Sequence, residues 1–109
     1  MWQKAYQFVL SLYRMTDSFP KREIYGLTSQ MRRAAVSVVA NIAEGFRRRG
    51  KSDKVRFLNI SQGSLEESRC FLFLCRDLDY ADSAVLLSSL GEVSKLLDSY
   101  SKAILASDS

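Results

Sequence analysis

Five polar side chains recur at steps of three and four residues, which places them on one face of a helix: Gln30, Arg33, Ser37, Asn41 and Glu44. A catalytic or binding site is one interpretation, because carboxylates act as general acids or bases and arginine binds anions. Its members would be Arg33, Asn41, Glu44 and Glu67. The structural alternative is that Arg33 pairs with Glu67 between two helices and that Asn41 completes the hydrogen bonds. No metal-ligand cluster, nucleophile–base pair or glycine-rich phosphate loop accompanies these residues. The pattern therefore favours the structural alternative, and no catalytic residue is predicted.

The absence of histidine from the 109 residues excludes several classes of chemistry. A Ser-His-Asp triad, a histidine metal site and an imidazole general base are all impossible. Cys70 and Cys75 do not have the spacing of a redox or zinc pair, and on a helix they would point about 140° apart. We therefore expect both cysteines to be buried and reduced, and we expect neither a metal nor a cofactor.

The strongest charge asymmetry of the chain lies between Phe46 and Phe57. This stretch has one acidic residue, Asp53, and six basic residues: Arg47, Arg48, Arg49, Lys51, Lys54 and Arg56. Its formal charge of +5, against +4 for the whole chain, leaves −1 for the rest. A basic cluster at a turn between helices is typical of phosphate binding, and arginine can grip a phosphate with two hydrogen bonds. The alternative is a solvated turn whose arginines complement the C-terminus of a helix, and the sequence favours neither.

The surroundings of this cluster restrict the kind of ligand. No helix-turn-helix and no aromatic sheet motif accompanies it, so we expect no readout of base sequence. A membrane surface is a poorer match, because the basic residues occupy a turn rather than one face of an amphipathic helix. The longest apolar run, residues 70–75, is far shorter than the about 20 residues that cross a bilayer. Since no signal peptide follows Met1, we expect a cytoplasmic protein.

Four helices must position these residues. Apolar side chains at helical spacing predict helices over residues 2 to about 17, 28 to about 48, 52 to about 77, and from 83 onward. Thr28 is the expected N-cap of the second helix, and Asp82 or Ser83 is the expected N-cap of the fourth. Residues 20–23 are expected to form a short helical turn. The fourth helix carries an apolar seam: Leu86, Leu90, Val93, Leu97, Tyr100 and Ile104. No segment alternates with period two. The chain is therefore predicted to be all-α, a single domain over residues 1–109 folded as an antiparallel up-down-up-down four-helix bundle.

The short turn between the two middle helices fixes their register. Residues in contact across this antiparallel pair have numbers that sum to about 100. Ser37 therefore lies opposite Ser64, and Arg33 lies opposite Glu67. Gly63 and Ser64 are expected to let the two helix axes approach closely. The prediction is a partly buried polar seam, made of Gln30, Arg33, Ser37, Asn41, Glu44, Ser64 and Glu67.

Two of the helices carry more apolar surface than one core requires. Residues 70–75 are apolar on every side of the third helix, and the first helix adds Trp2, Tyr6, Phe8 and Tyr13. A helix that is hydrophobic all round must be buried all round, whereas each helix of a four-helix bundle leaves one side open. We therefore expect a homo-oligomer, whose subunit number does not follow from this pattern.

Several motifs along the chain resemble one family. They are Phe19-Pro20 followed by Glu23 and Gly26-Leu27, Gln30-Met31-Arg32-Arg33-Ala34-Ala35 with Ser37, Asn41-Ile42-Ala43-Glu44-Gly45, and Gly63-Ser64-Leu65-Glu66-Glu67. In order and spacing they are similar to the bacterial four-helix-bundle proteins encoded in 23S rRNA intervening sequences. The resemblance extends from Trp2 to about Tyr100.

The resemblance implies a four-helix protomer that assembles into a cyclic homopentamer. The family is also similar in architecture to the accessory proteins of diversity-generating retroelements, which are basic pentamers that bind nucleic acid and a protein partner. No catalytic residues are established for the family, so the resemblance implies none. We accordingly expect a non-enzymatic oligomer that binds RNA or DNA through the basic residues between positions 47 and 56. The alternative is an oligomeric scaffold that binds another protein.

Overall fold

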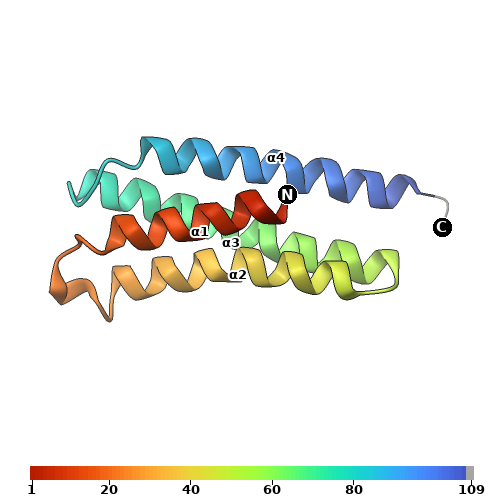
Figure 1. Cartoon of the computed structure of the whole chain (residues 1–109), viewed down its shortest axis with the longest axis horizontal. Helices are drawn as coiled ribbons and strands as arrows, with labels where there is room; N and C mark the ends of the chain where they lie inside the picture. The colour runs from red at the N-terminus through yellow and green to blue at the C-terminus, as the bar shows by residue number, and fades with distance from the viewer. Residues whose placement is uncertain (108–109) are drawn as a thin grey trace.

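Four long α-helices form an antiparallel bundle in which the chain runs up, down, up and down (Figure 1). The computed structural model describes residues 1–107. Its helices are α1 (Trp2–Thr16), α2 (Leu27–Arg47), α3 (Lys51–Asp77) and α4 (Ala84–Ala106), with a short 3-10 turn, η1 (Lys21–Glu23), after α1. These residues contain no strand, and the predicted all-α four-helix fold is confirmed.

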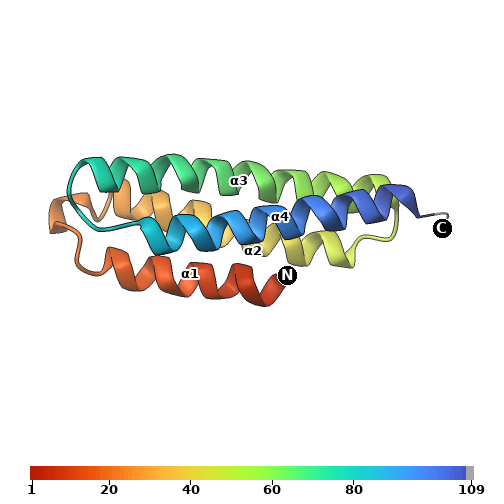
Figure 2. The ribbon, with the colours of Figure 1, turned by 90° about the horizontal axis from the view of Figure 1, so that it is seen from above.

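The helices differ in length, and this leaves one end of the bundle with three helices. α1 has 15 residues, whereas α2, α3 and α4 have 21, 27 and 23. α1 begins beside the middle of the bundle and runs toward η1, so the α2–α3 turn and the end of α4 extend beyond it, as Figure 1 and Figure 2 show. The α4 seam is therefore buried as far as Leu97, while Tyr100 remains 41% exposed.

A continuous apolar core runs along the bundle and takes side chains from all four helices. Its largest fully buried members include Phe8, Leu12, Met31, Ile42, Leu58, Leu65, Leu72, Leu90 and Leu97. Full burial of one such side chain contributes about 1.5–3 kcal/mol. The core therefore supplies most of the favourable free energy of folding, and the polar contacts select the register and the helix ends.

The start of α2 differs from the expectation. α2 begins at Leu27 with Gly26 as N-cap, and Thr28 is buried within the first turn, so the prediction of Thr28 as N-cap is wrong. The cause is a competing acceptor, because the Leu27 backbone N–H donates to Glu23 Oε1 over 3.3 Å. η1 thus supplies the cap from outside the helix. Ser83 is the N-cap residue of α4, one of the two expected positions.

α2 and α3 are the most extensively packed pair of helices, and their register agrees with the predicted sum of about 100. Ser61 Oγ donates to the Val38 backbone oxygen over 2.7 Å, a buried hydrogen bond between the two helices. Near the turn, a Cβ atom added to Gly45 would lie 3.3 Å from both Leu58 Cδ2 and the Lys54 backbone oxygen. The two helices therefore approach closely where glycine and serine replace larger side chains.

Gly63 does not have the role expected of it. It is exposed, and a Cβ atom added there would meet no atom within 4 Å. The buried residues of α3 form one stripe along the helix: Leu58, Ser61, Ser64, Leu65, Ser68, Leu72 and Cys75. Position 63 falls on the opposite side of the helix from 61 and 65. The expectation that Gly63 permits close approach is therefore wrong, whereas it holds for Ser64.

The two cysteines have different environments. Cys75 is buried, as expected, and its Sγ donates to the Leu72 backbone oxygen over 3.3 Å. Cys70 is exposed, so the expectation of burial is wrong for this residue. Position 70 lies outside the buried stripe of α3, as do Phe73 and Leu74, which are 39% and 45% exposed. The run 70–75 therefore leaves apolar side chains on the surface of α3.

Candidate nucleic-acid interface

The six basic residues between positions 47 and 56 lie together at the α2–α3 turn and are called the basic tip below. They are Arg47, Arg48, Arg49, Lys51, Lys54 and Arg56. α2 ends at Arg47 and α3 begins at Lys51, and Arg48 and Gly50 between them have extended backbone. The turn is therefore short, and it lies at the three-helix end of the bundle (Figure 1).

Lys54 stabilises the end of α2. Its Nζ donates to the backbone oxygens of Gly45 and Phe46 over 3.4 and 3.1 Å. The last carbonyls of a helix have no partner within the helix, and a cation there also complements the negative end of the helix dipole. Lys54 is thus engaged in holding the turn, although one of its three N–H donors remains available.

Arg48 and Arg56 are engaged as well, and both lie over the ring of Phe57. Their guanidinium carbons are 4.6 and 4.5 Å from the ring centroid, within the range of cation–π contacts. Arg48 also donates to Glu44 over 2.5 Å, and Arg56 donates to Asp53 over 3.3 Å. The Nε of Arg48 is buried without a hydrogen-bond partner. These contacts reduce the freedom of both arginines to reach an external phosphate.

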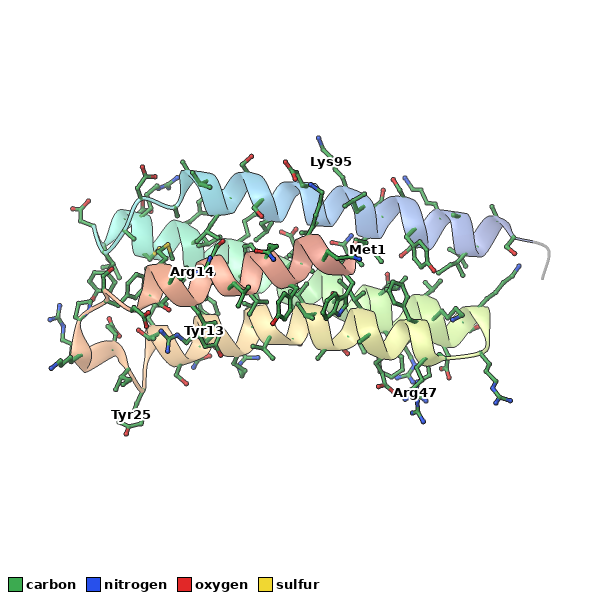
Figure 3. The ribbon with its side chains drawn as sticks, viewed as in Figure 1. Met1, Tyr13, Arg14, Tyr25, Arg47 and Lys95 are labelled. Atoms are coloured by element: carbon green, nitrogen blue, oxygen red, sulfur yellow. The ribbon has the colours of Figure 1, made fainter. Side chains whose placement is uncertain are left out.

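The remaining three cations of the basic tip form no ion pair within residues 1–107. Arg47 and Arg49 are exposed and Lys51 is partly exposed. Figure 3 shows Arg47 extending away from the helices. The first turn of α3 has no side-chain cap, so its backbone N–H groups add positive potential at the same place. Arg47, Arg49 and Lys51 are therefore the side chains best placed to bind an anion.

A pocket of about 400 Å³ lies between the basic tip and the end of α4. Arg49, Lys51 and Lys54 line it from the tip. Tyr100 and Ile104 are among the residues that line it from α4. The pocket thus combines cationic side chains with an aromatic ring, and it lies at the end of the bundle that α1 does not reach (Figure 1).

The predicted contacts of the polar seam are present between α2 and α3. Arg33 donates to Glu67 Oε2 over 2.6 Å, with the two side chains 56% and 40% exposed. Ser37 Oγ and Ser64 Oγ are 2.8 Å apart. Asn41 Nδ2 donates to the Ser37 backbone oxygen over 2.8 Å and to Ser37 Oγ over 3.1 Å. The contacts form two groups, the Arg33–Glu67 ion pair and the hydrogen-bonded set of Ser37, Asn41 and Ser64, and Asn41 bonds within the second group rather than to Arg33 or Glu67.

Two members of the seam belong to neither group. Gln30 is exposed, and its side chain makes no hydrogen bond among the described residues. The position opposite it in the register is 70, where the Cys70 thiol is only a weak donor and a weak acceptor. Glu44 accepts from Arg48 and therefore belongs with the basic tip. The four residues of the hypothetical catalytic site, Arg33, Asn41, Glu44 and Glu67, are thus divided among three groups: Arg33 with Glu67, Asn41 with Ser37, and Glu44 with Arg48.

Sequence reasoning missed two aromatic residues beside the basic tip. In the sequence, Phe57 is only the boundary of the charged stretch, whereas in the structure its ring lies beneath both Arg48 and Arg56. The apolar pattern predicts Tyr100 in the core seam, whereas its ring packs against Phe46, with centroids 5.5 Å apart at an angle of 73°. The short first helix was the available signal for the exposure of Tyr100.

At the opposite end of the bundle, Glu23 accepts hydrogen bonds from two other segments of the chain. Tyr80 Oη donates to Glu23 Oε2 over 2.8 Å, and the Phe19 ring packs 5.3 Å from the Tyr80 ring. The hydrogen bonds from Tyr80 and from the Leu27 backbone hold the pKa of the Glu23 carboxyl below its ordinary value of 4.5. This contact joins η1 to the loop between α3 and α4 and fixes the end of the bundle away from the basic tip.

Residues 1–107 contain neither a metal-ligand cluster nor a membrane-spanning helix. Within this range no three acidic, cysteine or histidine side chains are grouped as metal ligands. None of the helices described there combines the length and apolar character needed to cross a membrane.

The fold and the basic tip define a class, small all-α proteins built as an antiparallel four-helix bundle with an arginine-rich end. The sequence profile of the 23S rRNA-intervening sequence protein family matches residues 1–99, and the chain belongs to that family. No curated protein matches it.

Solved structures show the same fold. One of them is a crystal structure of a protein of unknown function from the S23 ribosomal protein family of Bacteroides thetaiotaomicron. The TM-score is 0.83 at 22% sequence identity, and the match covers 93% of this chain and 97% of that chain. The similarity supports the four-helix architecture over nearly the whole length.

Proposed function

We propose that this chain is a non-enzymatic, oligomeric four-helix-bundle protein that binds RNA or another nucleic acid without strong sequence preference. The main support is the group of three cations, Arg47, Arg49 and Lys51, that have no acidic partner within residues 1–107. Because the family takes its name from 23S rRNA intervening sequences, a structured RNA is the first ligand to test.

The engaged and the free cations of the basic tip have complementary roles in this proposal. Lys54, Arg48 and Arg56 are held by carbonyls, carboxylates and the Phe57 ring, and they fix the turn. The free cations are then presented on a rigid support, which lowers the entropy cost of binding. Contacts from such cations to phosphates release counterions, so the affinity is expected to fall steeply with salt.

The test is a titration of a labelled structured RNA, followed by fluorescence anisotropy at two salt concentrations. The triple variant Arg47→Ala, Arg49→Ala and Lys51→Ala is compared with Arg14→Ala, Lys21→Ala and Lys95→Ala. Both remove three positive charges, but the second set is exposed and lies away from the tip. The plot of log K against log salt has a negative slope, and we expect the tip variant to make it shallower by up to about 0.9 for each phosphate that the tip no longer binds. The control variant should change this slope little.

Two results would contradict the proposal. Absence of RNA binding even at low salt would refute nucleic-acid binding. Equal loss of affinity in the two triple variants would show that the overall charge of the protein, rather than the basic tip, attracts RNA.

Exposed apolar side chains support the oligomeric part of the proposal. A groove of about 230 Å³ between α1 and α2 is lined by Tyr6, Val9, Val36, Val39 and Ala40. An apolar groove of this kind is typical of surfaces that pack against another subunit. The resemblance of the sequence to pentameric proteins makes a ring of five the expected assembly.

Light scattering on the purified protein tests this assembly. We expect a species larger than the monomer at micromolar concentration, and we expect Val36→Lys to shift it toward smaller species by placing a charge in the groove. Val85→Lys is the control, because Val85 is 81% exposed on α4 outside the groove. A wild-type monomer at micromolar concentration would contradict the oligomer.

A scaffold that binds another protein is the second candidate function. It is favoured by the exposed apolar residues Phe73, Leu74 and Leu78 on and just after α3, which are 39%, 45% and 45% exposed. Recovery of one specific protein partner that resists nuclease and high salt, together with no affinity for RNA, would favour the scaffold over nucleic-acid binding.

A further inference from the structure

The pocket between the basic tip and the end of α4 combines two kinds of chemistry on facing walls. The wall from the tip is cationic and the wall from α4 is apolar and aromatic. Its volume of about 400 Å³ falls within the range of small-ligand sites, about 300–1,000 Å³. A plain charged turn would attract phosphates without placing an apolar and aromatic surface beside them.

The cationic wall has donors that are free to bind a phosphate. Arg49 and Lys51 have no acidic partner among residues 1–107, and Lys54 uses two of its three N–H donors on the carbonyls of α2. The uncapped start of α3 adds backbone N–H groups beside them. The wall can therefore neutralise one or two phosphate charges.

The aromatic wall has a ring that is held in place and still accessible. Tyr100 packs against Phe46 in an edge-to-face contact with centroids 5.5 Å apart, and it remains 41% exposed. A ring fixed by a neighbour loses little conformational entropy when a planar group stacks on it. Ile104 extends the apolar surface along the same wall.

We propose that this pocket binds one nucleotide unit of a single strand, with the base stacked on Tyr100 and the phosphate on Arg49 and Lys51. The inference rests on the proposed function and specifies its ligand. Stacking on an aromatic side chain requires an unpaired base, because the bases of a duplex are stacked on one another and cannot enter a pocket. The protein therefore binds single-stranded segments, loops or ends in preference to regular duplex.

The experiment compares labelled hexauridylate with an RNA duplex of equal total charge, using anisotropy at fixed salt. Tyr100→Leu removes the ring and keeps every charge, so we expect about tenfold weaker binding of hexauridylate, an unchanged salt slope and unchanged duplex binding. Tyr100→Phe is expected to bind like the wild type. Tyr25→Leu is the matched control, because Tyr25 is 95% exposed at the opposite end (Figure 3).

Circular dichroism of each variant verifies that the bundle is intact, and competition identifies the source of the nucleotide. Displacement of hexauridylate by micromolar uridine monophosphate would assign the pocket to a free nucleotide, and displacement only at millimolar concentration would assign it to a strand. Both support base-plus-phosphate recognition. Unchanged hexauridylate binding by a folded Tyr100→Leu variant would overturn the inference while leaving the proposed function intact. Failure of the wild type to bind either RNA would refute the proposed function itself.

Discussion

Gly45 and Gly63 both lie inside helices, but their surroundings are opposite. A Cβ atom at Gly63 would meet open space, so Gly63→Ala is expected to stabilise the fold by about 1 kcal/mol, because alanine favours helix over glycine. This corresponds to a rise in Tm of about 4–8 °C for a domain of this size. At Gly45 the new atom would lie 3.3 Å from the Lys54 backbone oxygen. Gly45→Ala should therefore stabilise the fold by less than Gly63→Ala does, or destabilise it.

Thermal unfolding followed by circular dichroism measures both glycine variants. A Gly45→Ala variant at least as stable as Gly63→Ala would mean that α2 and α3 are farther apart near the turn than the structure places them.

The Glu23 carboxyl should make the stability depend on pH. Its pKa is lowered in the folded state, first by the hydrogen bond from Tyr80 and then by the Leu27 backbone. A lowered pKa means that the contribution is present above the ordinary value of 4.5 and is lost as the pH falls through the lower folded value. We therefore expect Tyr80→Phe to lower Tm at pH 7 and to have less effect at pH 3. Tm measured between these values tests this, and a difference that grows toward pH 3 would contradict it.

The identity of the basic tip could be predicted at the residue scale, but the partners of its members could not. The distribution of charged residues along the sequence located the excess positive charge between positions 47 and 56. Whether a cation is available to bind a ligand depends on side-chain geometry. Arg48 and Arg56 are both engaged, because their guanidinium groups pack over the Phe57 ring. For Lys54 a signal existed, since Lys54 and Gly45 satisfy the same sum of about 100 that sets the register.

At the scale of the elements, the register of α2 against α3 could be predicted because the connecting turn is short and the pair is antiparallel. The Ser37–Ser64 and Arg33–Glu67 contacts follow from that arithmetic. The error at Gly63 arose because the sum specifies height along the helix pair and not which side of the helix a residue occupies. The start of α2 was misplaced because its capping group, Glu23, comes from another element.

Ser64→Leu tests this helix pair. Ser64 is 9% exposed and lies 2.8 Å from Ser37, so a leucine there should overpack the interface and destabilise the fold by about 1–3 kcal/mol. The control is Asn59→Leu, an exposed position of α3 where we expect a change within about 0.5 kcal/mol. Urea unfolding gives both values, and equal stability of Ser64→Leu and the wild type would contradict the observed register.

At the scale of the whole molecule, the unequal helix lengths produce two different ends. The end at η1 is tied by the Glu23–Tyr80 hydrogen bond, whereas the end at the basic tip has three helices and an open pocket. The sequence already contained this asymmetry, since the first apolar stripe is the shortest of the four. The exposure of Tyr100, which follows from this asymmetry, became evident only from the arrangement of the helices in space.

Hydrogen–deuterium exchange with and without a structured RNA tests the central claim most directly, because it locates the contact in the intact protein. The backbone amides of residues 49–53 precede the first hydrogen bond of α3, from Lys54 N to Gly50 O, and should exchange quickly in the free protein. We predict that RNA slows exchange over residues 46–57 and leaves residues 20–26 at the opposite end unchanged. Unchanged exchange at the basic tip when the protein is saturated with RNA, or equal slowing at both ends, would contradict the account.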